Sequence, residues 1–198
     1  MSAEYCRMAP AHPFHGPYHD GEYGFPARDD RVLFERLVLE INQAGLSWLT
    51  VLQKRKAFAA AFADYDLARI AGFGAADVKR LLGDAGIIRN RLKIEAVVAN
   101  ARTVIEIAER EGSFAAWLDA HHPRPKADWV KLFRETFRFT GGEIVGEFLM
   151  SLGYLPGAHV PSCPVQTKIL RLRPPWAHKV KAKVSQKRHR RAKATAQK

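Results

Sequence analysis

The hydrophobic positions along the chain follow a helical period from about residue 30 to residue 152. Apolar residues recur every three or four positions, and glycine or proline separates most of these segments. The expected helices cover about 30–43, 47–55, 56–66, 67–71, 75–82, 89–111, 113–122, 127–137 and 142–152. No segment shows the alternation of a half-buried strand, so the pattern predicts an all-α protein.

The two ends of the chain lack this period. Residues 1–27 are rich in Pro, His, Gly and Tyr, and we expect an irregular segment lined by aromatic side chains rather than a helix. The sequence beyond Trp176 is a low-complexity run of Lys, Arg and Ala, which is typical of a disordered tail. The pattern therefore predicts one all-α domain over 1–176 and a basic tail over 177–198.

Charge also separates the tail from the domain. The 198-residue chain has a formal net charge of +12, and residues 167–198 contain twelve Lys and Arg but no acidic residue. The rest of the chain is therefore formally neutral. A tail of one sign favours a polyanionic partner, most simply nucleic acid, although such a tail can also serve only solubility.

Cysteine usage and hydropathy indicate the compartment. Two cysteines are too few for the disulfide framework of a small secreted protein. The chain does not open on a signal-peptide pattern, and no apolar run reaches membrane-spanning length. We therefore expect a monomeric protein of the reducing cytoplasm, with no membrane partner.

One acidic residue interrupts the apolar face of the expected helix 30–43. At about 100° per residue, Glu40 falls on the same stripe as Leu33, Leu37 and Ala44. A lone buried carboxylate is costly, so Glu40 must be paired, protonated or positioned for a ligand. Arg36 lies one turn earlier and offers the ordinary alternative, which is a structural salt bridge.

The segment 75–101 is predicted to form two helices joined by a glycine-containing turn. Backbone N–H groups in such a turn, beside a helix N-terminus, can bind a phosphate. The candidate DNA-binding residues are Gly86, Arg89, Asn90, Arg91 and Lys93. The segment resembles a helix-hairpin-helix DNA-binding element, although an ordinary helical hairpin has the same pattern.

The ends of the expected domain contain residues that bind zinc in many proteins. Two cysteines and two histidines can form a closed tetrahedral zinc site. Cys6 and Cys163 are the only cysteines, whereas the candidate histidines are His12, His15, His19, His121, His122 and His159. Spacing alone does not select among them, and buried thiols with surface histidines are the simpler alternative.

Aromatic residues lie near these groups in the sequence. Tyr18 and Tyr23 belong to the N-terminal segment, and Trp48 follows the turn after Glu40. Aromatic faces beside a carboxylate suit a flat cationic ring, although core packing would also explain them.

Three blocks of sequence are similar to the DNA-3-methyladenine glycosylase I family. They are PYHDGEYG at 17–24, LEINQAGLSWLTVLQKR at 39–55 and DAGIIRNRLKIEAVVANA at 84–101. The similarity extends from Cys6 to about Cys163. It implies a helix-hairpin-helix glycosylase fold and a repair enzyme that flips an alkylated purine, most simply 3-methyladenine, out of double-stranded DNA and hydrolyses its glycosidic bond.

The resemblance also assigns residues to sites. It implies that Tyr18, Glu40 and Trp48 form the pocket for the alkylated base. It implies a structural zinc ion held by Cys6, His19, His159 and Cys163. No lysine is placed for a Schiff base, so we expect a monofunctional hydrolase without lyase activity.

The chain departs from the family pattern around the pocket. Tyr23 and Met8 stand where Trp is usual, the pair Ile41-Asn42 after the glutamate is unusual, and the segment before His159 is shorter. The choice of lesion is therefore less defined than the fold. Two alternatives follow, which are a zinc-containing DNA-binding protein without catalysis and a glycosylase for a different lesion.

Overall fold

A computed structural model describes residues 3–178, and these residues form helices and no strand. The α-helices are α1 Ala3–Met8, α2 His15–Gly21, α3 Asp30–Gln43, α4 Trp48–Ala61, α5 Leu67–Ala71, α6 Ala75–Gly83, α7 Arg91–Glu111, α8 Phe114–His121, α9 Lys126–Thr136, α10 Gly142–Ser151 and α11 Pro164–Arg171. Two 3-10 turns, η1 Ala63–Tyr65 and η2 Pro175–Ala177, complete the set. The all-α prediction is confirmed, while the predicted basic tail lies outside the described residues from position 179 onward.

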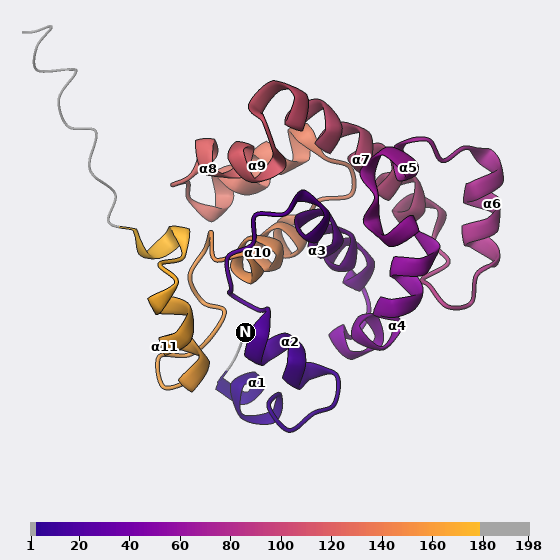
Figure 1. Ribbon diagram of the computed structural model, residues 1–198. Coiled ribbons are helices and arrows are strands. Elements are labelled where there is room, and N and C mark those ends of the chain that lie inside the picture. The colour runs from indigo at the N-terminus through magenta and orange to yellow at the C-terminus, as the bar shows by residue number, and fades with distance from the viewer. Residues whose placement is uncertain (1–2, 179–198) are drawn as a thin grey trace, which may run out of the picture.

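Helix α3 lies at the centre of the fold, where it contacts α4, α7, α8 and α10 (Figure 1). Its first turn is capped by Asp29, whose carboxylate accepts hydrogen bonds from the N–H groups of Arg31 and Val32. Asp30 accepts hydrogen bonds from the N–H groups of Phe114 and Ala115 at 2.8 and 3.1 Å, which ties α3 to the start of α8. The helix that carries Glu40 is therefore fixed at its N-terminal end.

The apolar stripe of α3 packs into one large core. Leu33, Leu37 and Val38 are fully buried, and they share this core with apolar residues of α4, α7, α8 and α10. Burial of one such side chain stabilises the fold by roughly 1.5–3 kcal/mol. Glu40 belongs to the same helix, so this packing positions its backbone. No helix among the described residues is long and apolar enough to cross a membrane.

The N-terminal segment contains two helices, so the prediction of an irregular segment without helix is wrong. Pro17 lies in the first turn of α2, where a missing N–H removes no helical hydrogen bond. Tyr18 and His19 are 1% and 0% exposed, respectively. Helices this short are not stable alone, and packing against the rest of the domain supplies what local composition does not.

Two further segments differ from the expected helices. Helix α4 runs without a break from Trp48 to Ala61, whereas the sequence suggests two helices that meet at residue 56. Helix α11 is not predicted, because Val165 and Ile169, its only buried residues, give too short a period to detect. In the structure, Cys163, Val165 and Ile169 pack with Cys6 of α1, so both ends of the domain lie together (Figure 1).

Candidate functional site

A cavity of about 490 Å³ opens at the C-terminal end of α3. It is bounded by α2, α3, the turn that follows α3, the start of α4, and α10. Its lining residues are Tyr18, Glu40, Gln43, Ala44, Gly45, Trp48, Glu143, Ile144 and Glu147. The three residues assigned to a base pocket from the sequence therefore line one cavity.

Glu40 faces this cavity without a polar partner. It is 4% exposed, and within residues 3–178 it has neither a hydrogen-bond nor an ion-pair partner. Burial raises the pKa of Glu40 well above its usual range, the charge of Glu147 raises it further, and Arg36 lowers it. A carboxylate in this state is suited to a ligand that brings a positive charge or a hydrogen-bond donor.

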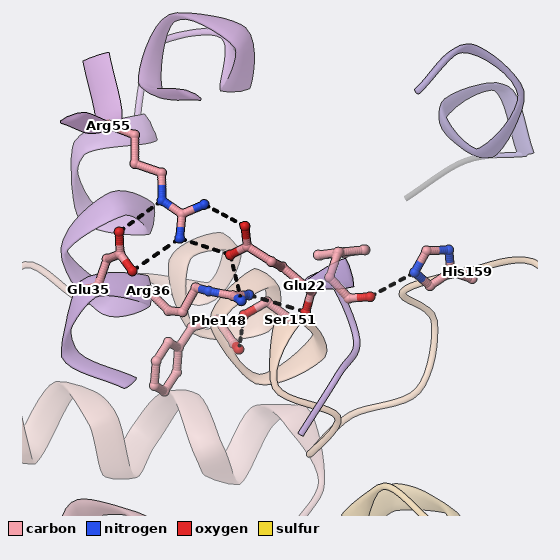
Figure 2. Close-up of polar contacts among 8 residues, drawn as sticks. Glu22, Glu35, Arg36, Arg55, Phe148, Ser151 and His159 are labelled. Carbon is pink, nitrogen blue, oxygen red and sulfur yellow. Dashed lines mark hydrogen bonds and ion pairs between the residues drawn. The ribbon is translucent and has the colours of Figure 1, made fainter. Parts of the chain in front are cut away.

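The alternative of a structural salt bridge between Arg36 and Glu40 is wrong. The Arg36 guanidinium donates to Glu22 Oε2 at 2.9 Å, and Glu22 also accepts hydrogen bonds from Arg55 (Figure 2). Arg55 in turn binds Glu35 at 2.8 Å, so these two arginines and two glutamates form one network (Figure 2). Arg36 is therefore occupied away from Glu40 and acts on it only through its charge.

Two aromatic side chains complete the cavity wall. The ring centroids of Tyr18 and Trp48 lie 5.0 Å apart. Tyr18 Oη and Trp48 Nε1 are both buried without a hydrogen-bond partner among the described residues. A buried unpaired donor is costly, and a ligand in the cavity would relieve that cost. The cavity thus offers aromatic faces, two free donors and an acidic group to a flat molecule.

The structure shows a further polar residue in this cavity that the sequence patterns do not single out. Glu147 lies on α10 between the buried residues Val145 and Phe148, and its Oε2 accepts a hydrogen bond of 2.8 Å from Tyr23 Oη. A carboxylate within an apolar helical stretch is the same signal that identifies Glu40. Applied to 142–152, it would identify Glu147 as well.

A second cavity, of about 420 Å³, is lined in part by Arg28, Asp119 and Tyr154 and contains none of the predicted site residues. Three of its polar side chains are already paired, since Tyr154 Oη donates to Asp119 Oδ1 at 2.7 Å and Arg28 binds the other carboxylate oxygen. The cavity at Glu40, where buried polar groups lack partners, is the better candidate.

The turn between α6 and α7 presents only some of its expected DNA-binding groups. Arg89 and Arg91 are exposed, and the Asn90 side chain accepts a hydrogen bond from the Lys93 N–H as the cap of α7. Gly86 donates its N–H to Asp84 Oδ1 at 2.7 Å, so this amide is not available to a phosphate. A Cβ on Gly86 would lie 2.9 Å from that oxygen and 3.0 Å from the Ala57 Cβ, which explains the glycine.

Lys93 does not lie with the exposed donors, and its assignment to DNA binding is corrected. It is 5% exposed, and its Nζ donates to the carbonyl oxygens of Asn42 at 2.9 Å and Ala44 at 2.7 Å. Burial lowers the pKa of Lys93. The ammonium group satisfies carbonyl groups at the C-terminus of α3, where positive charge is favourable.

Replacing Lys93 with Met should destabilise the fold by about 1–3 kcal/mol, because buried carbonyl groups lose their donor. Urea denaturation of the two proteins measures this difference. Lys79→Met provides a matched control, since Lys79 is exposed on α6. If both variants unfold at the same denaturant concentration as the original protein, Lys93 does not support the end of α3.

The four predicted metal ligands lie together. One ligand atom from each of Cys6, His19, His159 and Cys163 falls within 4.8 Å of the others. The Cys163 Sγ lies 3.5 Å from His159 Nδ1 and 3.7 Å from His19 Nε2. In a tetrahedral site with Zn–S of about 2.3 Å and Zn–N of about 2.0 Å, sulfur and nitrogen are separated by roughly 3.5 Å. The spacing of the four groups therefore fits one zinc ion.

The surroundings of the two histidines also suit metal binding. His19 Nδ1 lies 2.6 Å from Asp20 Oδ1, and His159 Nε2 lies 2.7 Å from the Tyr23 carbonyl oxygen. These contacts orient the rings so that His19 Nε2 and His159 Nδ1 face the thiols, as partners of metal-bound histidines commonly do. His12, His15, His121 and His122 are not part of this cluster.

The sequence and the fold of the chain are also similar to those of known proteins. Residues 8–131 match the family model of methyladenine glycosylases. The chain is 34% identical to DNA-3-methyladenine glycosylase 1 of Escherichia coli K12 over 180 residues. The aligned region covers 81% of this chain and 95% of that protein. The chain is 32% identical over 169 residues to DNA-3-methyladenine glycosylase of Haemophilus influenzae, covering 76% and 91%, respectively.

A solved structure of 3-methyladenine DNA glycosylase I from Staphylococcus aureus superimposes on this chain with a TM-score of 0.73 and is 32% identical to it. That structure addresses how the Staphylococcus aureus enzyme recognises 3-methyladenine. The match covers 83% of this chain and 97% of that one. A second solved structure, of a tyrosine-to-phenylalanine variant of 3-methyladenine DNA glycosylase I in complex with 3-methyladenine, gives a TM-score of 0.74 at 30% identity and covers 82% and 97%.

Proposed function

The chain belongs to the methyladenine glycosylase family, and on this premise we propose that it removes alkylated purines, above all 3-methyladenine, from double-stranded DNA by hydrolysis of the glycosidic bond. The observation that carries the proposal is Glu40, a buried carboxylate without a partner in a cavity walled by Tyr18 and Trp48. A purely DNA-binding protein would have no use for this costly arrangement.

The cavity suits a base that leaves the duplex. A purine alkylated at N3 cannot be reached inside the stack, so its nucleotide must be flipped out at a cost of a few kcal/mol. The flipped base is flat and cationic. The rings of Tyr18 and Trp48 attract it through their faces, and the Glu40 carboxylate attracts its charge and its exocyclic amino group.

Bond cleavage then requires little acid catalysis. The positive charge of the alkylated base already weakens its bond to the sugar, and positive charge develops on the sugar as the base departs. The cavity carboxylates bind and orient the cationic base, and their negative charge also favours the positive charge that develops on the adjacent sugar. The base leaves as a neutral molecule, and water adds to the sugar carbon and releases one proton. No lysine lines the cavity, so no Schiff base forms, and the product is an intact strand with an abasic site.

An alkali-dependent strand-cleavage assay tests this reaction. A methylated duplex incubated with the protein should gain alkali-sensitive abasic sites, while strands analysed without alkali should stay uncut. Strand cleavage before alkali treatment would contradict a monofunctional hydrolase. A duplex that gains no alkali-sensitive sites would contradict glycosylase activity.

The α6–α7 turn is the proposed DNA backbone contact, in the manner of a helix-hairpin-helix element. Arg89 and Arg91 are exposed beside the N-terminus of α7, where positive side chains and the helix dipole both favour phosphate. The Glu95 carboxylate lies 3.4 Å from Arg91, an exposed and therefore weak ion pair that a phosphate can replace.

The single substitutions Arg89→Ala and Arg91→Ala should each weaken binding to undamaged DNA of any sequence. Each lost phosphate contact should reduce the slope of log affinity against log salt concentration by about 1. Fluorescence anisotropy at several salt concentrations measures this slope. Arg134→Ala, which removes an exposed arginine from α9, is the matched control. If all three variants show the same slope as the original protein, DNA does not bind at this turn.

The cluster of two cysteines and two histidines is the proposed site of one structural zinc ion. Its ligands come from α1, α2 and the segment that leads into α11, so a bound ion would join both ends of the domain. Burial lowers the pKa of His159, which favours the neutral imidazole that zinc requires. Four protein ligands close the site, and the ion would therefore support the fold rather than the reaction.

A further inference from the structure

The cavity at Glu40 carries charge of one sign. Glu40, Glu143 and Glu147 all line it, and none of its lining residues is Lys, Arg or His. Residues 1–166 as a whole balance 20 basic residues with 20 acidic residues, so this concentration is local. A narrow space lined by carboxylates attracts cations and disfavours uncharged molecules of the same shape.

Of the two glutamates on α10, only Glu147 is held inside the cavity. Glu143 is exposed over 91% of its side chain and lies 3.8 Å from Lys126, so water and this lysine screen it. Glu147 is half-buried, and its carboxylate accepts the hydroxyl hydrogen of Tyr23 at 2.8 Å. Among residues 3–178 it has no basic partner, so its charge is positioned but not neutralised.

Tyr23 is itself fixed. It is fully buried, its ring centroid lies 5.6 Å from that of Tyr18, and its carbonyl oxygen lies 2.7 Å from His159 Nε2. Tyr23 is also one of the positions at which the sequence departs from the family pattern. The departure supplies the hydroxyl group that orients Glu147.

We propose that Glu147, held by Tyr23, is a second base-recognition carboxylate, and that it makes the cavity select permanently cationic purines over neutral purines. This inference rests on the proposed function, because it concerns the same cavity. Glu147 would thus contribute to specificity. Normal adenine is neutral and gains little from a second carboxylate, whereas an alkylated cationic purine gains a second favourable charge interaction.

Burial and two charged groups shift the pKa of Glu40. Burial raises this pKa, the charge of Glu147 on α10 raises it further, and the charge of Arg36 on α3 lowers it. Tyr5 on α1, Tyr18 on α2 and Tyr23 after α2 have raised pKa values because they are buried, so they stay uncharged at neutral pH. Glu40 therefore keeps its proton to higher pH than an ordinary glutamate, and binding of a cationic base would displace that proton.

Isothermal titration calorimetry with two model bases tests the proposal directly. The cation 3,9-dimethyladenine carries methyl groups at the alkylated nitrogen and in place of the sugar, and 9-methyladenine is its neutral counterpart. The preference for the cation should fall by about tenfold in Glu147→Gln, with little change for the neutral base. Glu109→Gln, which removes the same charge from an exposed position of α7, should keep the original preference.

Two further readouts separate recognition from a merely structural role. Tyr23→Phe keeps the ring and the Glu147 charge but loses the hydrogen bond, so the preference should fall by a smaller factor. Cation affinity should also rise with pH as Glu40 loses its proton. In Glu147→Gln the midpoint of this rise should move to lower pH, because the charge that raises the pKa of Glu40 is absent.

An unchanged preference in folded Glu147→Gln, or no preference for the cation in the original protein, would overturn the proposal. If Glu147→Gln does not fold, an unchanged preference in Tyr23→Phe overturns it instead. Failure of the proposed function looks different. In that case the original protein would bind the cation selectively and Glu147→Gln would lose the preference, yet no base would leave alkylated DNA.

Discussion

Replacing Glu40 with Gln should reduce excision of the alkylated base at least roughly tenfold, which corresponds to about 1.4 kcal/mol of transition-state stabilisation. Gln keeps the size and packing of the side chain but removes the negative charge that favours a cationic base. Single-turnover release of base from methylated DNA measures the loss. Equal rates for the variant and the original protein would show that the Glu40 charge does not act on the substrate.

The same substitution should leave thermal stability unchanged or increase it, because Glu40 is buried without a partner among the described residues. Burial raises the folded-state pKa of Glu40 above its ordinary value of 4.5. Below pH 4.5 Glu40 is protonated in both the folded and the unfolded protein, and its burial does not reduce stability through charge. As pH rises through the folded-state pKa, the buried side chain becomes charged and this stability is lost. The advantage of Gln should grow over this range, which melting curves at several pH values would show.

Glu22→Gln provides the matched control for stability. Glu22 accepts hydrogen bonds from Arg36 and Arg55, so this variant weakens the pairing of one buried and one half-buried arginine (Figure 2). It should lower the melting temperature, in contrast to Glu40→Gln. If Glu40→Gln lowers the melting temperature while the folded fraction keeps its original excision rate, Glu40 is structural.

Loss of the proposed zinc site should have the largest effect on folding. Cys163→Ser should abolish stoichiometric zinc binding and destabilise the domain by on the order of 4 kcal/mol, at the upper end of single-substitution effects. The reason is that Cys163 and His159 at one end of the domain would lose their connection to Cys6 and His19 at the other. Elemental analysis and urea denaturation measure the two effects.

The neighbouring residue offers a control for the zinc experiment. Ser162 is exposed, and Ser162→Ala should keep both the zinc and the original stability. A strong chelator should lower the stability of the original protein toward that of Cys163→Ser and leave Cys163→Ser itself unchanged. Purified protein without stoichiometric metal, or a Cys163→Ser variant as stable as the original protein, would contradict a structural zinc ion.

Periodic features are accessible from the sequence, whereas long-range pairs are not. The stripe that contains Glu40 follows from the geometry of one helix, and it correctly predicts that this carboxylate lies in the interior. Local sequence groups Lys93 with two exposed arginines and so suggests a contact with DNA. Its carbonyl partners, on Asn42 and Ala44, lie about fifty residues earlier in the chain, and no local pattern reports them.

The pairing of Tyr23 with Glu147 shows the same limit, since 124 positions separate the two residues. The N-terminal helices escape prediction for a related reason, because packing of Tyr18 and His19 stabilises a segment whose composition indicates irregular structure. For the metal site, residue counting leaves six histidines as candidates. The family resemblance selects His19 and His159, and these are the two histidines that the structure brings together with both cysteines.

The most direct test of the central claim is chromatography of the bases that the purified protein releases from N-methylated duplex DNA. The account predicts that 3-methyladenine appears as a free base in proportion to protein and time, that unmodified adenine does not, and that Glu40→Gln releases it at least roughly tenfold more slowly. Protein that binds this DNA but releases no methylated base would contradict the account.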